Sequence, residues 1–164
     1  MPFQVESDLK VEGRRLKVGG FSLLEVVISF AILGLILVII TAGFNRFSQS
    51  QALTATAADV VSVLDTARSK TLASEGNSAF GVHFATSSVT LFQGNTYATG
   101  TATNVVTTFD RKITLSSSLT AGRGDVVFRR LTGETDTVGI ITLSVIGGSA
   151  STTISISQTG LVGQ

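Results

Sequence analysis

The chain lacks cysteine, and its 164 residues include a single histidine, His83, and a single proline, Pro2. The lack of cysteine excludes disulfides, cysteine metal sites and thiol catalysis, and one histidine excludes a histidine-rich metal site within one chain. The sequence also contains no phosphate-binding glycine loop, no convincing carboxylate pair and no nucleophile matched with a base. It therefore predicts a protein that is not an enzyme and that holds no cofactor and no metal.

Charged residues are scarce, at 14% of the chain, and much of this scarcity comes from one long apolar run, residues 21–44. As a helix this run would be about 36 Å long, enough to cross a hydrocarbon core of about 30 Å. Arg14, Arg15 and Lys17 lie just before it. This arrangement predicts a single-pass anchor in the cytoplasmic (inner) membrane, with a cytoplasmic N-terminus and an exported C-terminal domain.

Two other interpretations of the run are a secretory signal, cleaved after Thr41-Ala42-Gly43, and a plain uncleaved anchor. The run is longer than the apolar region of a usual signal, about 7–15 residues, and it carries the acidic residue Glu25 near its start. A lone acid in hydrocarbon is costly and usually marks function, although a glutamate can also extend to the headgroups at little cost. The residues next to Glu25 therefore decide which interpretation is favoured.

These residues form the sequence Gly20-Phe21-Ser22-Leu23-Leu24-Glu25-Val26. It resembles the processing site of type IV pilins and type II secretion pseudopilins. In that family a membrane-embedded prepilin peptidase cuts after the glycine and N-methylates the new terminal phenylalanine. The resemblance implies that residues 1–20 are a cleaved leader, that the cut lies between Gly20 and Phe21, and that Phe21 is N-methylated.

The same resemblance implies four kinds of partner: the prepilin peptidase, other major and minor pilins or pseudopilins, an inner-membrane assembly platform, and membrane lipid. A cut before Phe21 would create an α-amine that is largely protonated at neutral pH. This amine and Glu25 would each be poorly solvated among lipid tails, and a neighbouring subunit in axial register can pair its amine with Glu25. We therefore expect Glu25 to guide assembly. Gly19 and Gly20 suit the cut because glycines disfavour a helix upstream of it.

The helix is predicted to continue beyond the membrane segment, since no proline interrupts the sequence. An apolar stripe follows one helical face at spacings of four, three, four and three, formed by Leu53, Ala57, Val60, Leu64 and Ala67. We expect one helix over residues 21–73, of which the second half, residues 45–74, is amphipathic and lies against a globular domain. Glu75-Gly76-Asn77 is its predicted stop.

Gly34 and Gly43 fall inside this predicted helix. Glycine is common in membrane helices, where it permits close helix packing. Each glycine also weakens a helix by roughly 1 kcal/mol relative to alanine. The sequence therefore supports two interpretations, close packing and local unwinding of the helix on assembly.

Residues 75–164 are predicted to form a β-rich domain, because short alternating runs are separated by Gly, Ser, Thr and Asn. The expected strands cover residues 80–84, 89–92, 105–109, 113–115, 126–131, 140–146 and 152–157. The first two should form a hairpin, Gly147-Gly148 should turn the chain before the last strand, and Gly160 should turn it afterwards. A helix that covers one face of an antiparallel sheet gives an α+β class, and the resemblance implies the pilin fold.

Two shorter motifs refine the resemblance. Ala67-Arg68-Ser69 and the glycine turn near Thr159-Gly160 are similar to those of the GspH/FimT subgroup of minor pilins and pseudopilins. In that subgroup an Ala-Arg-Ser-like helix end is followed by a hairpin, and two paired strands precede a closing glycine turn.

The other polar residues carry no functional expectation. His83 is expected on the solvent side of its strand, without partner ligands. Arg123-Gly124-Asp125 matches a short integrin-binding string, but charges around a glycine before a strand are ordinary in turns. Arg129 and Arg130 are adjacent strand residues in this prediction. They should face opposite ways and therefore form no compact patch unaided.

The predicted function is that of a minor pilin or pseudopilin, a structural subunit of a type IV pilus or a type II secretion pseudopilus. One alternative is a pilus subunit that captures DNA for natural transformation, and another is a membrane-anchored adhesin or sensor outside any filament. DNA binding by FimT-like members is associated with basic residues near the C-terminus, and residues 159–164 contain none. Five basic and five acidic residues from Glu75 onward give zero net charge, so nucleic acid is a disfavoured partner.

Overall fold

The computed structural model describes residues 20–163. The predicted leader, residues 1–20, lies outside the described residues except for Gly20. The chain divides into two compact units between Thr41 and Ala42.

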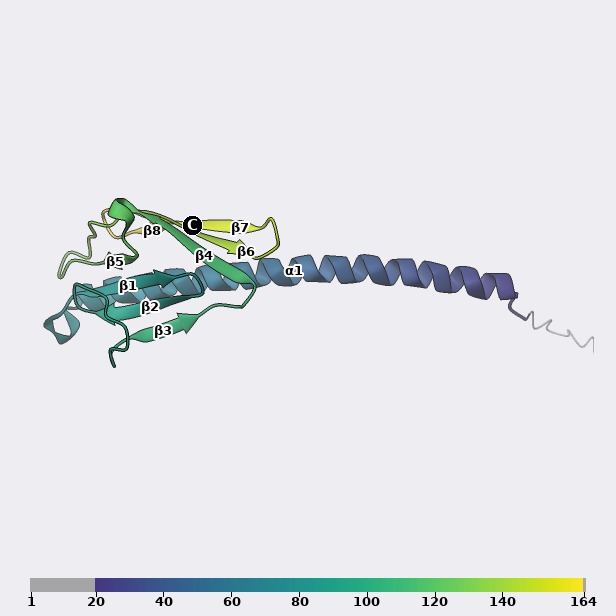
Figure 1. Ribbon diagram of the computed structural model, residues 1–164, viewed down its shortest axis with the longest axis horizontal. Coiled ribbons are helices and arrows are strands. Elements are labelled where there is room, and N and C mark those ends of the chain that lie inside the picture. The colour runs from purple at the N-terminus through teal and green to yellow at the C-terminus, as the bar shows by residue number, and fades with distance from the viewer. Residues whose placement is uncertain (1–19, 164) are drawn as a thin grey trace, which may run out of the picture. The chain divides into compact units, whose positions relative to one another are not determined.

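Helix α1 (Leu23–Leu72) is continuous over 50 residues (Figure 1). It begins two residues after the predicted start, because Ser22 occupies the N-cap position and its carbonyl accepts the first helical hydrogen bond, from the N–H of Val26 at 3.1 Å. Glu25 lies in the first turn, where a carboxylate interacts favourably with the helix dipole. The helix is continuous through Gly34 and Gly43 in this single chain, outside any filament. Its unwinding on assembly therefore stays a prediction.

The end of α1 is at the predicted place. The chain leaves the helix through Ser74, Gly76 and Asn77, which all have positive φ angles between 53° and 58°. A short 3-10 helix, η1 (Glu75–Asn77), follows. Lys70 forms an ion pair with Glu75 at 2.7 Å across the turn. This turn reverses the chain, so that the first strand returns along the second half of α1.

Eight strands lie within the described residues: β1 (Phe80–Ala85), β2 (Ser88–Gln93), β3 (Val105–Thr108), β4 (Ile113–Leu119), β5 (Asp125–Val127), β6 (Gly139–Val145), β7 (Ser151–Ile156) and β8 (Val162–Gly163). They form two four-stranded sheets, with the order β3-β2-β1-β5 in sheet A and β4-β6-β7-β8 in sheet B. All pairs are antiparallel. The predicted hairpin is confirmed as β1–β2, in which Val82 lies opposite Leu91.

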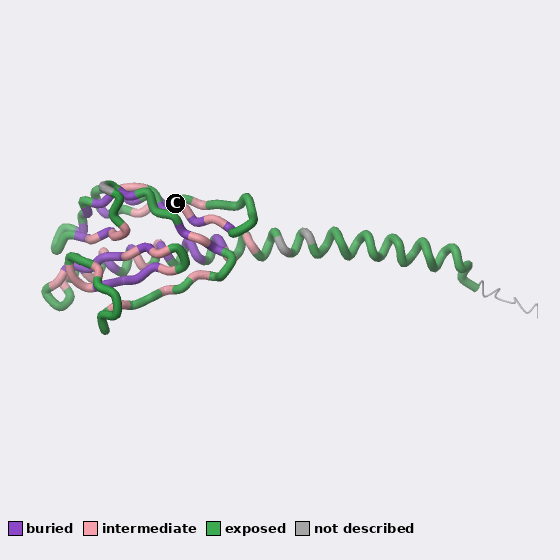
Figure 2. Tube along the Cα trace, viewed as in Figure 1, coloured by how far each residue is buried: buried purple, intermediate pink, exposed green. Residues whose placement is uncertain are grey.

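Both sheets contribute to one hydrophobic core with the second half of α1 (Figure 2). The predicted apolar stripe is confirmed, since its five residues are between 0% and 7% exposed. Sheet A adds alternating residues such as Val82 and Phe84, and sheet B adds Ile141, Leu143 and Ile154. A hydrogen bond of 2.8 Å from the N–H of Leu115 to the carbonyl of Thr86 joins the sheets. The expected α+β class, with a long helix packed on antiparallel sheets, is therefore confirmed.

One predicted strand, over residues 126–131, is wrong in its second half. Strand β5 ends at Val127, and only an isolated bridge between Phe128 and Thr135 follows. Leu131 and Gly133 both have a φ of 66°, so the backbone turns there. Sequence alternation did not predict this turn, because Phe128 is buried as a strand residue would be.

Candidate functional site

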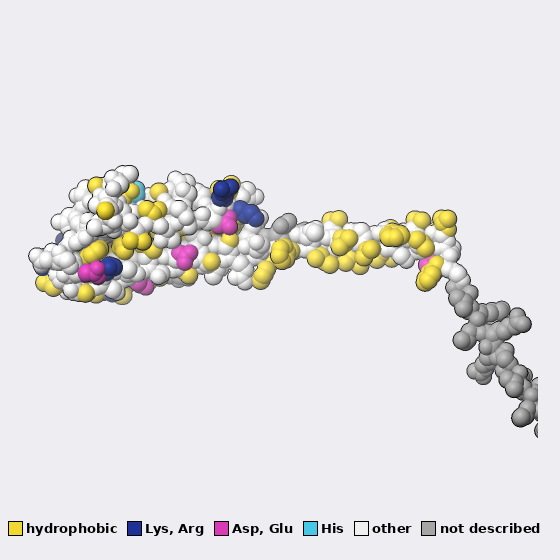
Figure 3. Space-filling view, turned by 90° about the horizontal axis from the view of Figure 1, so that it is seen from below, with side chains coloured by type: hydrophobic (Ala, Val, Ile, Leu, Met, Phe, Trp, Pro, Cys, Tyr) yellow, Lys and Arg dark blue, Asp and Glu magenta, His cyan; other side chains and the backbone are white. Residues whose placement is uncertain are grey.

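The N-terminal unit exposes an apolar surface. From Leu23 to Ile40, the large apolar side chains of α1 are exposed, and Figure 3 shows these yellow side chains gathered over this part of the helix. The most apolar stretch of α1 is long and apolar enough to cross a membrane, and none of this stretch is buried in the protein. An exposed apolar surface of this size requires lipid or other protein to cover it. This unit is therefore suited to membrane anchoring.

The predicted cut site is accessible. Gly20 is exposed and not helical, and Phe21, the next residue, is 81% exposed. The space around Gly20 is open, because a Cβ added there would meet no atom within 4 Å. A peptidase needs non-helical, unobstructed backbone at the bond that it cuts, and the residues on both sides of the predicted bond are outside the helix and exposed. The cut itself stays a prediction.

Glu25 is the only ionisable residue between Phe21 and Asn45. Its side chain is exposed, and within residues 20–163 no salt bridge involves it. Ser29, one turn later, donates its hydroxyl to the backbone carbonyl of Glu25 at 2.7 Å, which leaves the carboxylate itself uninvolved. The part of α1 before Asn45 thus presents one acid among mostly apolar side chains.

In the C-terminal unit, Arg68 connects the two motifs that suggested the GspH/FimT subgroup. Its Nε donates to the carbonyl of Gly133 at 3.3 Å, and its Nη2 donates to the carbonyl of Thr159 at 3.4 Å. Gly160, the next residue, lies directly over the Gly133 carbonyl. Arg68 and Thr159 are 91 residues apart in the sequence. The helix end Ala67-Arg68-Ser69 and the turn Thr159-Gly160 nevertheless form one junction.

We expect Arg68→Ala to lower the free energy of unfolding by about 1–2 kcal/mol, because two carbonyls lose a charged donor. Arg68→Lys should recover only part of this loss, since one ammonium cannot reproduce the forked geometry of a guanidinium. Chemical denaturation of the detergent-solubilised chain, monitored by circular dichroism, measures the change. Stability unchanged in Arg68→Ala would show that the junction is held by packing alone.

A polar pocket of about 550 Å³ lies where β1 begins and where β2 and β5 end. Its lining includes three arginines, Arg123, Arg129 and Arg130. The expectation that Arg129 and Arg130 are strand residues facing opposite ways is therefore wrong: both follow the end of β5 and both line this one pocket. Sequence reasoning missed the pocket because the turn after Val127 and the proximity of Arg123 are set by tertiary structure.

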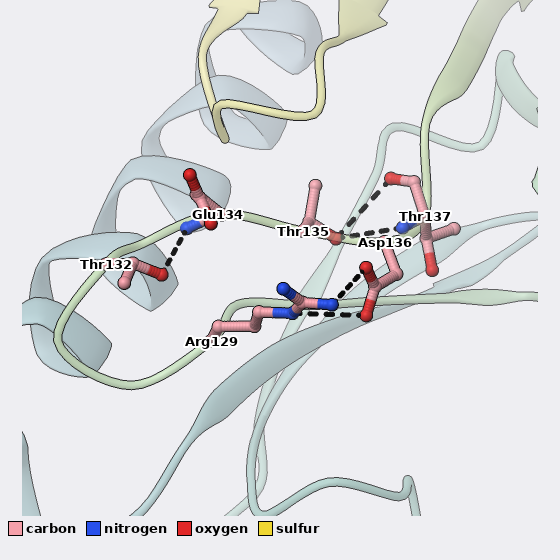
Figure 4. Close-up of polar contacts among 6 residues, drawn as sticks. All are labelled: Arg129, Thr132, Glu134, Thr135, Asp136 and Thr137. Carbon is pink, nitrogen blue, oxygen red and sulfur yellow. Dashed lines mark hydrogen bonds and ion pairs between the residues drawn. The ribbon is translucent and has the colours of Figure 1, made fainter.

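The three arginines have different surroundings. Arg129 donates to both carboxylate oxygens of Asp136, at 2.6 and 3.2 Å, and Figure 4 shows the two side chains facing each other across the loop. Hydrogen bonding to Asp136 and the negative charge of this carboxylate raise the pKa of Arg129. Arg130 donates to the backbone carbonyl of Asn77 at 3.0 Å. For Arg123, no hydrogen bond or ion pair occurs among the described residues.

His83 lies on the outer face of sheet A, opposite the face that carries Val82 and Phe84. It is not simply solvated, however, because the Tyr97 ring stacks on it at 3.9 Å between ring centroids. Its Nδ1 pairs with Asp125 Oδ1 at 2.5 Å. Asp125, the last residue of the Arg-Gly-Asp string, is thus engaged within the protein, where it fixes the start of β5 to β1. In residues 20–163 no three His, Asp or Glu side chains are placed to hold a metal.

Comparisons with known proteins agree with both units. The family model described as the prokaryotic N-terminal methylation motif matches residues 15–41. The fold is similar to that of the type IV minor pilin FimU of Pseudomonas aeruginosa, with a TM-score of 0.54 and 17% sequence identity, over 71% of this chain and 90% of that chain. A second crystal form of FimU gives a TM-score of 0.52 and 16% identity, over 68% and 90%. No curated protein matches the chain by sequence.

The chain therefore combines a prokaryotic N-terminal methylation motif with the fold of a type IV pilin. The motif and the fold independently support the predicted resemblance to the type IV pilin family. The apolar helix together with this motif indicates membrane anchoring.

Proposed function

We propose that the chain is a minor pilin or pseudopilin of the GspH/FimT subgroup, a structural rather than enzymatic subunit of a type IV pilus or a type II secretion pseudopilus. Prepilin peptidase removes residues 1–20 and N-methylates Phe21. Before assembly, the chain resides in the cytoplasmic membrane with its N-terminus on the cytoplasmic side and its β-domain outside. An inner-membrane assembly platform then moves it into a filament with other pilins or pseudopilins.

One observation carries this proposal. The methylation motif at residues 15–41 coincides with the part of α1 whose apolar side chains are exposed, while one face of the second half of the same helix is buried in a domain with a pilin-like fold. An ordinary membrane anchor needs neither the motif nor a helix shared between anchor and domain. A filament subunit uses both, because the exposed half leaves lipid for a core of sister helices.

The chemistry of assembly follows from the cut. Before cleavage, Phe21 is joined to a leader that contains Arg14, Arg15 and Lys17, and these charges oppose withdrawal of the helix end into an apolar bundle. After cleavage the helix begins with one α-amine, four residues before Glu25. When the subunit enters the bundle, the amine of one subunit and Glu25 of its neighbour neutralise each other, and only one axial register allows this pairing.

Mass analysis of the native N-terminus tests the proposal. We expect the mature protein to begin at Phe21 and to carry one additional methyl group on its α-amine. The control is the same chain expressed without prepilin peptidase, which should retain Met1 to Gly20. A native protein that keeps its leader would instead support the membrane-anchored adhesin, and one that begins at Phe44 would support a secretory signal.

A further inference from the structure

The pocket that Arg123, Arg129 and Arg130 line has no role in the assembly chemistry. It lies in the β-domain, and it is open at the surface, because all three arginines are exposed. Its volume of about 550 Å³ lies within the range of roughly 300–1,000 Å³ typical of small-molecule sites. We propose that this pocket binds a small, hydroxyl-rich carboxylate. The representative ligand of this class is a uronic acid, which is an acidic sugar.

The charge of the pocket favours a single negative group. Arg129 donates two hydrogen bonds to the carboxylate of Asp136. The opposite charges of this pair cancel, so the pair adds no net charge to the pocket. Arg130 is positioned by its bond to the Asn77 carbonyl, and a guanidinium keeps further N–H groups for a second acceptor. Arg123 has no partner among the described residues. Arg123 and Arg130 thus line the same pocket with charged donors that a carboxylate can accept.

The uncharged part of the lining favours hydroxyl groups on the ligand. Asn77, Asn95 and Ser78 are among the lining residues, and both asparagines are exposed. An amide donates and accepts hydrogen bonds, as a sugar hydroxyl does, so the two are complementary. A site for an inorganic ion alone would have no use for these amides.

A nucleic acid fits the same residues less well. Phosphate-driven binding requires basic residues spread along a backbone, whereas these arginines surround one concavity that also contains the acid Asp136. The β-domain from Glu75 onward carries five basic and five acidic residues, which leaves no net attraction for a polyanion. The proposal therefore commits to a monoanionic saccharide and treats phosphate recognition as an outcome that contradicts it.

Titration calorimetry with the detergent-solubilised full chain tests the site. The probes are glucuronate, glucose, acetate and inorganic phosphate. We expect glucuronate to bind at least about tenfold more tightly than glucose or acetate, since it alone offers both the carboxylate and the hydroxyls. No measurable glucuronate binding at millimolar concentration, or phosphate binding as tight as that of glucuronate, would overturn the proposal.

Variants assign the binding to this pocket. Arg123→Gln should weaken glucuronate binding about tenfold, whereas Asp136→Asn should strengthen it, because the pocket loses an acid and Arg129 becomes available. Two changes of opposite sign cannot both result from misfolding. The matched control is Arg111→Gln, which removes an exposed arginine outside the pocket and should leave the affinity unchanged. Equal effects of Arg111→Gln and Arg123→Gln would contradict the site, while leaving the filament proposal intact.

Discussion

Replacing Glu25 by alanine is expected to leave cleavage before Phe21 intact and to reduce incorporation into filaments about 100-fold or more. The variant keeps the glycine, the phenylalanine and the apolar run that the peptidase requires, so processing should continue. In an apolar helix bundle, however, the new α-amine of the neighbouring subunit would have no counter-charge, and an uncompensated buried charge is strongly destabilising. Immunoblots of sheared filaments, compared with the membrane fraction, measure incorporation.

Ser29→Ala is a matched control for this experiment. Ser29 is one turn from Glu25, it is exposed, and within residues 20–163 its hydroxyl bonds only the Glu25 backbone carbonyl. The variant should enter filaments normally, because it leaves the carboxylate unchanged. Glu25→Gln separates charge from size, and it should be as defective as Glu25→Ala. If Glu25→Ala enters filaments normally, the pairing of amine and carboxylate is not the basis of register.

The second half of α1 shows what can be predicted from the sequence. Its apolar stripe follows the helical period, and every one of its five residues is buried. A periodic pattern reports burial directly, because helix geometry alone decides which residues share a face. The alternation of Ile154 and Ile156 with serines is equally informative, since both isoleucines are buried in sheet B. Local periodicity thus predicted the elements that form the core.

Two polar features of the C-terminal unit, the arginine-lined pocket and the Arg68 junction, could not be predicted in this way. The pocket depends on a turn after Val127, where Leu131 adopts a positive φ that a β-propensity pattern cannot reveal. It also depends on Arg123, which reaches the pocket from the segment before β5. Arg68 was noticed only as part of a family-like motif, and its carbonyl partners in Gly133 and Thr159 are set by long-range contacts. Such sites depend on loop conformation and tertiary packing, to which local periodicity is insensitive.

The glycine turn near the C-terminus gives the second large expected effect. Gly160 has a φ of 74°, and a Cβ added there would lie 2.0 Å from the backbone oxygen of Gly133 and 3.0 Å from Arg68 Nε. Gly147, in the turn between β6 and β7, has the same φ of 74°, but a Cβ there would meet nothing within 4 Å. The two glycines therefore share the backbone requirement and differ only in their surroundings.

Gly147→Ala should lower the free energy of unfolding by about 1 kcal/mol, the cost of placing an L-residue in the left-handed region. Gly160→Ala should lower it by about 3–4 kcal/mol, because the clash with a backbone carbonyl adds overpacking strain to that cost. Chemical denaturation of both variants in detergent, monitored by circular dichroism, measures the difference. Equal losses would mean that the loop carrying Gly133 moves aside at no cost. A larger loss in Gly160→Ala would show instead that the junction of Arg68, Gly133 and Gly160 is rigid. Both glycines have the same φ, and only Gly160 has close neighbours that an added Cβ would meet.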